Sequence, residues 1–263
     1  MGGRQISLAN FGAVNCANLD DAALAAVQAE PLAFRQAIDC FTCGIYRFED
    51  FVNAAVGTYF TNTAAGSGAA TGVVSTDVTR VGILQLSTGT DTTGGLTTRI
   101  GAAPLTAGDG RLWFHALIKL TTLRTAGEDF AVRIGFFDST NASPVDGAYF
   151  LYDSTSANWQ TRMVSNSSAT VATSTSVVVT GEWQAFSVVF AADGSDVKFY
   201  IGETLIATHT LTIPTGIARA FGCGAMIVKS AGSTARTMQM DYASFYFHAD
   251  TPRTNTMSFL PME

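Results

Sequence analysis

Charged residues are scarce in this sequence of 263 residues: Asp, Glu, Lys and Arg together make up 14% of it, where about 25% is usual for soluble domains. Long apolar runs are missing as well, although 47% of the residues are hydrophobic, because no run approaches the ~18 residues of a membrane-spanning helix. The apolar surplus must therefore be buried inside protein. We expect part of it to lie between subunits of a homo-oligomer, with a trimer as a plausible state. A Ser- and Thr-rich surface that is soluble without charge is the alternative.

Basic residues are few and dispersed, which disfavours a nucleic-acid partner. The chain has 15 Lys and Arg against 21 Asp and Glu, a net charge of −6, whereas nucleic-acid binding needs clustered positive charge. The first residues, MGGRQISLANFG, have no apolar core behind basic residues, so we expect no secretory signal and synthesis in the cytoplasm. These observations predict neither a nucleic-acid partner nor a membrane partner.

Cysteine is also rare. Cys40 and Cys43 form a C-x-x-C pair, but no second Cys pair or Cys/His pair follows, as a zinc site would require. Cys16 and Cys223 stand alone. We expect all four to act as small apolar side chains in a reduced compartment.

Signatures of catalysis are largely missing. A glycan-cleaving β-sandwich needs two carboxylates facing one cleft, and no Glu-x-Asp-x-x-Glu strand occurs in the sequence. The adjacent pairs Glu49-Asp50 and Glu128-Asp129 would point to opposite faces in a strand, so we expect them in solvated turns. No G-x-S-x-G elbow is present, although a Ser-His-Asp triad stays open for one of three histidines on separate predicted strands: His115, His209 and His248. We therefore expect a protein that is not an enzyme.

Strand patterns fill most of the chain between residues 47 and 248. Thr, Val and aromatic residues alternate in segments separated by Gly, Asp and Asn, which predicts an all-β, two-sheet antiparallel sandwich. In the segment 111–120, Leu112 and Phe114 begin a wholly apolar face, while Trp113 and His115 lie on a mixed face that we expect to be half covered. The small, polar segment 61–72 predicts a mobile loop. The strands are expected at 80–87, 111–120, 129–138, 147–153, 158–164, 182–190, 196–202, 204–211, 221–228 and 237–247.

The two ends of the chain have other patterns. Residues 1–46 are Ala-rich, with Asn18 as a helix N-cap and Pro31 as a break, which predicts a short helical arm. Residues 249–263 contain two prolines and predict an extended tail. We expect these ends to anchor the protein to sister subunits or to a larger particle through their apolar side chains: Leu24, Val27, Phe34, Ile38, Phe41, Met257, Phe259 and Leu260.

The segment 181–211, GEWQAFSVVFAADGSDVKFYIGETLIATHTL, predicts a three-stranded meander. Asp193-Gly194 favours a tight turn, and Gly202-Glu203 suits a type II′ turn. The segment resembles the central meander of concanavalin-A-like jelly rolls, the superfamily of laminin-G domains, lectins and glucanases. Ile201 replaces the usual Asn or Asp before the turn glycine, so the turn is a variant.

A wider likeness covers about residues 110–247. The segment KSAGSTART, followed by a strand with Asp241-Tyr242, resembles a type of bacteriophage virion protein that has this sandwich. The resemblance implies a jelly roll on a virion, as a capsid decoration, head-fibre or tail-fibre component with other virion proteins as partners. A carbohydrate-binding module for host-surface glycan is the alternative hypothesis, and a glycan hydrolase or lyase is a weaker one.

Two loops carry candidate sites. Lectin-like jelly rolls often bind calcium in loops, and Asp138, Asn141 and Asp146 offer oxygen ligands; an ordinary Asx-turn loop is the alternative, and we expect no other cofactor. The segment YDSTSANW places four residues with sugar-binding chemistry in one short loop, although Trp159 could instead pack in the core. These glycan-binding candidates are Tyr152, Asp153, Asn158 and Trp159.

Overall fold

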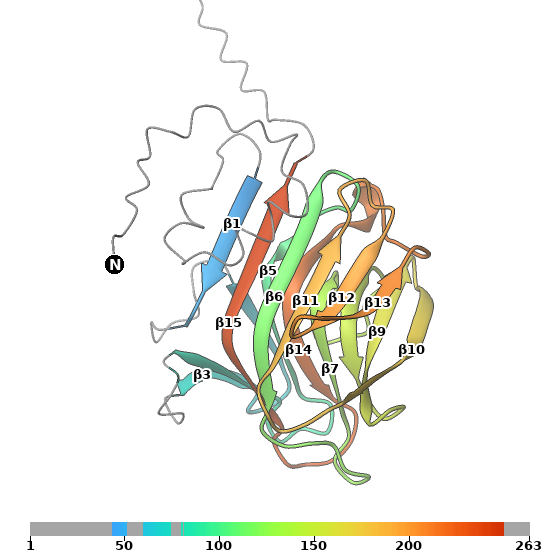
Figure 1. Cartoon of the computed structure of the whole chain (residues 1–263). Helices are drawn as coiled ribbons and strands as arrows, with labels where there is room; N and C mark the ends of the chain where they lie inside the picture. The colour runs from blue at the N-terminus through green and yellow to red at the C-terminus, as the bar shows by residue number, and fades with distance from the viewer. Residues whose placement is uncertain (1–43, 52–59, 75–79, 81, 250–263) are drawn as a thin grey trace, which may run out of the picture.

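The computed structural model describes residues 44–51, 60–74, 80 and 82–249. In these ranges the protein is a sandwich of two antiparallel sheets, which we call sheet A and sheet B (Figure 1). No helix in the described part is long and apolar enough to cross a bilayer. Residues 1–43 of the predicted helical arm and 250–263 of the predicted tail lie outside the described residues, as do all eight predicted anchors. Residues 44–46, assigned to the end of the arm, instead begin the strand Gly44–Glu49.

Sheet A has eight strands in the order β13-β12-β11-β6-β15-β4-β3, with β1 also paired to β15. Its strands are β1 (Gly44–Glu49), β3 (Ala70–Val74), β4 (Ile83–Ser87), β6 (Arg111–Leu120), β11 (Gln184–Phe190), β12 (Val197–Ile201), β13 (Thr204–His209) and β15 (Thr237–His248). Sheet B has seven strands in the order β10-β9-β8-β7-β14-β5-β2. They are β2 (Phe60–Ala65), β5 (Gly95–Leu105), β7 (Phe130–Phe137), β8 (Gly147–Tyr152), β9 (Asn158–Ser165), β10 (Ser168–Val178) and β14 (Phe221–Lys229); one 3-10 turn, η3 (Ile217–Arg219), precedes β14.

The core lies between the sheets and is dominated by aromatic rings. Phe136 of β7 lies at its centre, with ring centroids of four other phenylalanines within 6.5 Å. Three of them come from the sheet A strands β6, β11 and β15, so Phe136 ties the two sheets together. Its four neighbours are Phe114, Phe190, Phe221 and Phe245.

The predicted meander is confirmed as β11, β12 and β13. Ile201 pairs directly with Thr204, so Gly202 and Glu203 form a two-residue turn, and Gly202 has a φ of 61°. A positive φ at the first turn residue is what a type II′ turn requires. The predicted alternation on β6 is also confirmed, since its second, fourth, sixth, eighth and tenth residues are buried and the others are half-buried.

The loop predicted at 61–72 is wrong, because this segment forms β2 in sheet B and β3 in sheet A. Its glycines suggested a linker, but Gly66 and Gly68 occupy a tight crossing between the sheets with φ of 85° and 75°. A Cβ on Gly66 would lie 2.9 Å from the Cα of Gly94. The small residues therefore permit close backbone packing there.

The two faces of β15 do not follow simple alternation. Alternation along 237–247 would place Met240, Tyr242 and Tyr246 on one face, but a register shift between Met240 and Tyr242 inserts Asp241 as a bulge. Met238 and Met240 consequently point into the core, as do Ala243 and Phe245, while Tyr242 and Tyr246 lie on the outer face. A bulge adds one residue to one strand and so inverts the alternation beyond it.

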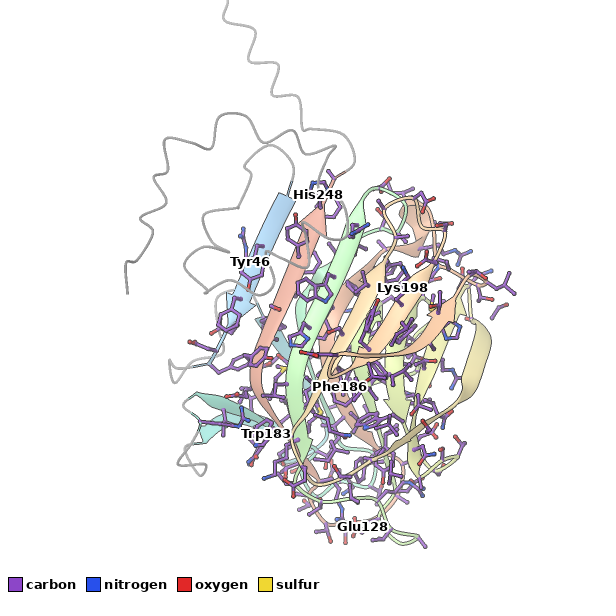
Figure 2. The ribbon with its side chains drawn as sticks, in the orientation of Figure 1. Tyr46, Glu128, Trp183, Phe186, Lys198 and His248 are labelled. Carbon is purple, nitrogen blue, oxygen red and sulfur yellow. The ribbon has the colours of Figure 1, made fainter. Side chains whose placement is uncertain are left out.

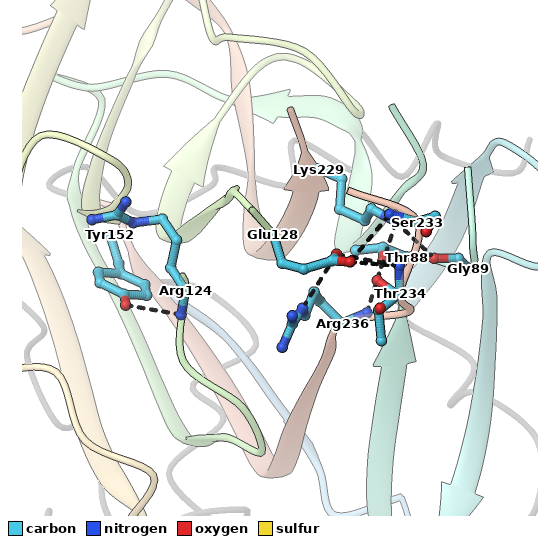
Figure 3. Close-up of polar contacts among 9 residues, drawn as sticks. All are labelled: Thr88, Gly89, Arg124, Glu128, Tyr152, Lys229, Ser233, Thr234 and Arg236. Carbon is cyan, nitrogen blue, oxygen red and sulfur yellow. Dashed lines mark hydrogen bonds and ion pairs between the residues drawn. The ribbon is translucent and has the colours of Figure 1, made fainter. Parts of the chain in front are cut away.

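At the end of the sandwich where β15 begins, contacts join three loops: the β4–β5 loop at Thr88 and Gly89, the β6–β7 loop at Glu128, and the β14–β15 loop at residues 230–236. We call this group of contacts the loop clamp (Figure 3). Glu128 accepts hydrogen bonds from the backbone N–H groups of Ser233 (3.2 Å) and Thr234 (3.0 Å), and its other oxygen lies 3.7 Å from Arg236 Nε. Gly232, with a φ of 91°, lets this loop approach, because a Cβ there would overlap the carboxylate of Glu128.

The loop clamp should make stability depend on pH in the acid range. Hydrogen bonding by Thr234, with smaller contributions from Ser233 and Arg236, lowers the pKa of Glu128. A lowered folded-state pKa stabilises the fold above the ordinary glutamate pKa of about 4.3, and this stabilisation is lost as the pH falls through the folded value. We expect Glu128→Gln to flatten the fall in Tm between about pH 4.5 and 3. Glu182→Gln, at an exposed position, is the control, and an unchanged slope in Glu128→Gln would contradict the role given to the clamp.

Candidate functional site

The outer face of sheet A carries a group of aromatic residues on neighbouring strands. Register brings Tyr46 of β1 opposite Tyr246 of β15, and Tyr246 opposite Trp113 of β6, so three aromatic side chains lie in one row. Side chains that alternate away from the buried face of a strand share its outer face. We call this surface the aromatic face, and its residues are Tyr46, Phe48, Trp113, His115, Tyr242 and Tyr246. Apart from Tyr46, which is buried, they are half-buried.

His115 lies at the centre of a chain of hydroxyl groups on this face. Its Nδ1 is 2.7 Å from the Ser187 hydroxyl of β11, and its Nε2 is 2.8 Å from the Tyr242 hydroxyl of β15. The Tyr242 ring also stacks on Phe48, with centroids 5.9 Å apart. Three adjacent strands thus hold the imidazole in one orientation.

The two ring nitrogens of His115 contact the hydroxyl groups of Ser187 and Tyr242, and Ser187 is 8% exposed. The Ser-His-Asp triad stays a prediction. His209 is also buried, and its Nε2 contacts Thr161 Oγ1 at 3.0 Å; burial lowers its pKa, which keeps the ring neutral. His248 stacks on Tyr246. Both ring nitrogens of His115 are thus engaged by hydroxyl groups of neighbouring strands.

Cations border the aromatic face at the start of β11. The guanidinium of Arg80 lies 4.9 Å from the ring centroid of Trp183, and the Lys119 ammonium lies 5.9 Å from it. Arg80 also forms an ion pair with Asp241 at 2.6 Å. The bulge in β15 therefore places the Asp241 carboxylate against the Arg80 guanidinium. Figure 2 labels Trp183, which marks this part of the sheet.

The predicted glycan loop does not present a sugar platform. Trp159 is 1% exposed and Tyr152 is 4% exposed, and the indole packs against Phe186 with centroids 4.7 Å apart. The alternative, that Trp159 begins a strand and packs in the core, is confirmed. Asp153 accepts hydrogen bonds from the Thr155 N–H and hydroxyl, and Asn158 starts β9. The Tyr152 hydroxyl accepts a hydrogen bond from the Arg124 N–H (Figure 3).

The predicted calcium ligands lie in the loop between β7 and β8, where protein groups contact each of them. Asp138 accepts a hydrogen bond from Val145 N–H, and Asn141 donates one to the Thr63 carbonyl. Asp146 accepts one from Asn166 N–H. In the described ranges no group of three or more His, Cys, Asp or Glu is gathered as a metal site, so calcium binding stays a prediction.

The aromatic face was not predicted from the sequence, although its residues on β6 could be recognised there. The mixed face of β6 already combined Trp113 with His115. Tyr242 and Tyr246 could not be assigned to the same surface as these residues, because the bulge at Asp241 is invisible to an alternation pattern.

Residues 79–241 match the family model described as the SO2946-like, C-terminal domain. The chain belongs to this family. Its fold is similar to that of SO2946, a protein of unknown function from Shewanella oneidensis MR-1, with a TM-score of 0.63 and 13% sequence identity over 88% of this chain and 95% of that one. No curated protein matches the sequence.

Other structures that resemble this SO2946-like chain share the concanavalin-like jelly roll of lectins and glucanases. The carbohydrate recognition domain of Emp47p has a TM-score of 0.52 and 9% identity, covering 80% of this chain and 99% of that domain. The CBM2 module of the evolved Dit protein of Lactobacillus casei BL23 phage J-1 has a TM-score of 0.51 and 13% identity, covering 79% and 97%. A glycosidic hydrolase and an alginate lyase also share the fold. At such identities these likenesses establish the all-β sandwich alone.

Proposed function

We propose that this SO2946-like protein is a non-enzymatic structural component of a phage-like virion. It would be a capsid decoration, head-fibre or tail-fibre protein that displays the sandwich and assembles through its terminal segments with sister subunits and other virion proteins. The observation that carries this proposal is the pairing of Gly44 with His248. The chain enters and leaves the sandwich on adjacent strands, at one corner.

This corner suits an attachment point. β15 has 12 residues and spans about 35 Å at ~3.3 Å per residue, so the corner at His248 and the loop clamp at Glu128 lie at opposite ends of the sandwich (Figure 2). Anchoring at His248 would leave the far end exposed to the surroundings. The low charge of the chain and the apolar side chains in both terminal segments support burial between subunits.

Assembly through the ends should be visible as a change of mass in solution. We expect Phe34→Ser combined with Phe259→Ser to shift the full chain from an oligomer to a monomer, because apolar interface area is lost. Size-exclusion chromatography with light scattering at micromolar concentration measures this. Leu205→Ser combined with Ile217→Ser changes two exposed apolar residues of the sandwich and should leave the mass unaltered. A double variant of the ends with the wild-type mass would count against the proposal.

Glycan attachment is a second candidate function, favoured by the aromatic face. Rings beside a fixed chain of hydroxyl groups combine apolar stacking with hydrogen bonding, and Trp113 lies next to His115 with centroids 6.1 Å apart. In this hypothesis the displayed sandwich binds host-surface carbohydrate across β1, β15 and β6. The phage CBM2 module that shares the fold supports this direction.

Removal of the Trp113 ring tests the second candidate. If a glycan stacks there, Trp113→Ala should weaken binding about tenfold or more, which corresponds to about 1.4 kcal/mol. A glycan array followed by calorimetry on its best ligand provides the measurement, with and without calcium. Trp159→Phe keeps an aromatic ring in the core and is the control. Equal losses of glycan affinity in the two variants would show that the aromatic face is not the binding surface.

A further inference from the structure

Two arginines lie on the outer face of sheet B, on the opposite side of the sandwich from the aromatic face. Arg133 is in β7 and Arg162 is in β9, and β8 runs between them. Tyr149 of β8 is opposite Arg162 and also opposite Gly135, two residues from Arg133. Ile134, the residue after Arg133, and Phe150, the residue after Tyr149, point into the core. By alternation, the two arginines and Tyr149 therefore lie on the outer surface of sheet B; Figure 1 labels the strands β7 and β9 that carry the arginines.

This arginine pair differs in its partners from four other arginines of the described ranges. Four arginines there lie within 4 Å of a carboxylate: Arg80, Arg124, Arg219 and Arg236. No ion pair within the described ranges involves Arg133 or Arg162. The Nε atoms of both are buried and make no hydrogen bond, as is also true of Arg124 and Arg236, which instead have a carboxylate oxygen within 4 Å; a buried donor without an acceptor is destabilising.

The polar contacts of Arg133 are with neutral groups, among them the side chain of Tyr149. One terminal nitrogen donates to the Ser143 hydroxyl at 3.3 Å, and the other lies 3.8 Å from the Met226 sulfur. Asp153 acts on Arg133 electrostatically, but its oxygen already accepts hydrogen bonds from Thr155. Burial lowers the pKa of Arg133, the neighbouring Tyr149 raises it through a side-chain hydrogen bond, and the charge of Arg162 lowers it.

Packing against apolar neighbours accounts for the methylene groups of these two arginines but not for their charged guanidinium groups. Tyr149 is 2% exposed and Met226 is 0% exposed, although both belong to an apolar cluster outside the main core. Long side chains such as arginine cover such surfaces with their methylene groups, and methionine or leucine would do the same without charge. The two like charges lie on one face of a chain with 21 acidic residues, and an anionic ligand would offset their repulsion.

We propose that Arg133 and Arg162 form a binding site for one anionic group of an acidic glycan, a carboxylate or a sulfate. Guanidinium groups recognise planar carboxylates and sulfate oxygens through paired N–H donors, and these charge-assisted bonds are about twice as strong as neutral ones. The pair is isolated, and the net charge is −6, so the site fits a single acidic sugar and not a polyphosphate backbone. The site is independent of the virion role proposed above and of the aromatic face.

The buried Nε–H groups provide a direct measurement. In the full-length protein, the ¹H–¹⁵N signals of the two arginine side chains are assigned from the spectra of Arg133→Lys and Arg162→Lys. Trigalacturonate supplies carboxylates, a heparin-derived tetrasaccharide supplies sulfates as well, and maltotriose is the neutral control. We expect both Nε signals to shift saturably with at least one acidic ligand and to be unchanged by maltotriose, and the preferred ligand tells carboxylate from sulfate.

Variants then test the residues. Arg133→Gln and Arg162→Gln should each weaken binding about tenfold, and Arg133→Lys should give an intermediate loss because the charge stays and the paired donors are lost. Lys198→Gln removes one charge from the outer face of the other sheet and should change binding less than about twofold. Where a glutamine variant fails to fold, the wild-type Nε shifts decide. Absence of saturable shifts with both acidic ligands, equal shifts with a ten-residue oligothymidylate, or an equal loss in Lys198→Gln would overturn the proposal.

Discussion

Replacing Phe136 with alanine is expected to lower the free energy of unfolding by about 3–5 kcal/mol, the usual range for a phenylalanine removed from a packed core. The ring is fully buried and lies among four other phenylalanine rings, three of which belong to the opposite sheet. Its loss leaves a cavity between the sheets that neighbouring strands cannot easily close. Urea unfolding followed by tryptophan fluorescence measures the change.

A matched variant separates core packing from the loss of any aromatic ring. Phe48→Ala removes the same side chain from a half-buried position on the aromatic face, where Phe48 stacks on Tyr242. We expect this variant to lose about 1 kcal/mol, the contribution of an aromatic pair on a partly solvated surface. Similar losses in the two variants would contradict the position of the core between the sheets.

The second large effect is expected at Lys229, which ends β14 and is 2% exposed. It has the same orientation as Ile227 in the core, but lies where the sandwich opens at the loop clamp. Its ammonium donates to the Thr234 carbonyl at 3.1 Å and to the Gly89 carbonyl at 3.4 Å (Figure 3). One buried cation thus joins the β4–β5 loop to the β14–β15 loop.

Lys229→Met keeps the length of the side chain and removes its donors. We expect a loss of about 2 kcal/mol, because each orphaned carbonyl costs about 1–3 kcal/mol while relief of the buried charge offsets part of this. Hydrogen exchange should accelerate in both loops. Lys198→Met on the half-buried outer face of β12 is the control, with an expected change below about 0.5 kcal/mol. A Lys229→Met protein as stable as the wild type would show that the carbonyls do not need the ammonium.

The sandwich itself was accessible from the sequence because its strands alternate cleanly. The ten predicted strand segments all correspond to strands, and the face assigned to β6 is confirmed by the burial of Leu112, Phe114 and Ile118. Five strands were missed: β1, β2, β3, β5 and β10. Three of these, β2, β5 and β10, are rich in Thr, Ser, Gly or Ala, so their alternation carries little hydrophobic contrast.

The site was harder to predict because it depends on relations between strands. The contact of His115 with Ser187 and Tyr242 joins residues 72 and 127 positions apart, and one bulge decides on which face Tyr242 lies. Trp159 shows the opposite error, since a tryptophan beside Asp and Asn resembled a sugar-binding loop while its ring fills the core. Local composition indicated candidate residues, but strand register decided which of them share a surface.

We propose that this SO2946-like protein is a structural protein with a displayed, glycan-binding sandwich and no catalytic activity. Product analysis tests this proposal most directly. Wild-type protein would be incubated for a day with neutral and acidic oligosaccharides, including any ligand found on the glycan array. Mass spectrometry would follow chain length, and absorbance near 235 nm would follow unsaturated products of elimination. We predict that every oligosaccharide is recovered intact. Shortened or unsaturated products that disappear in a His115→Ala variant would contradict the claim and make the aromatic face an active site.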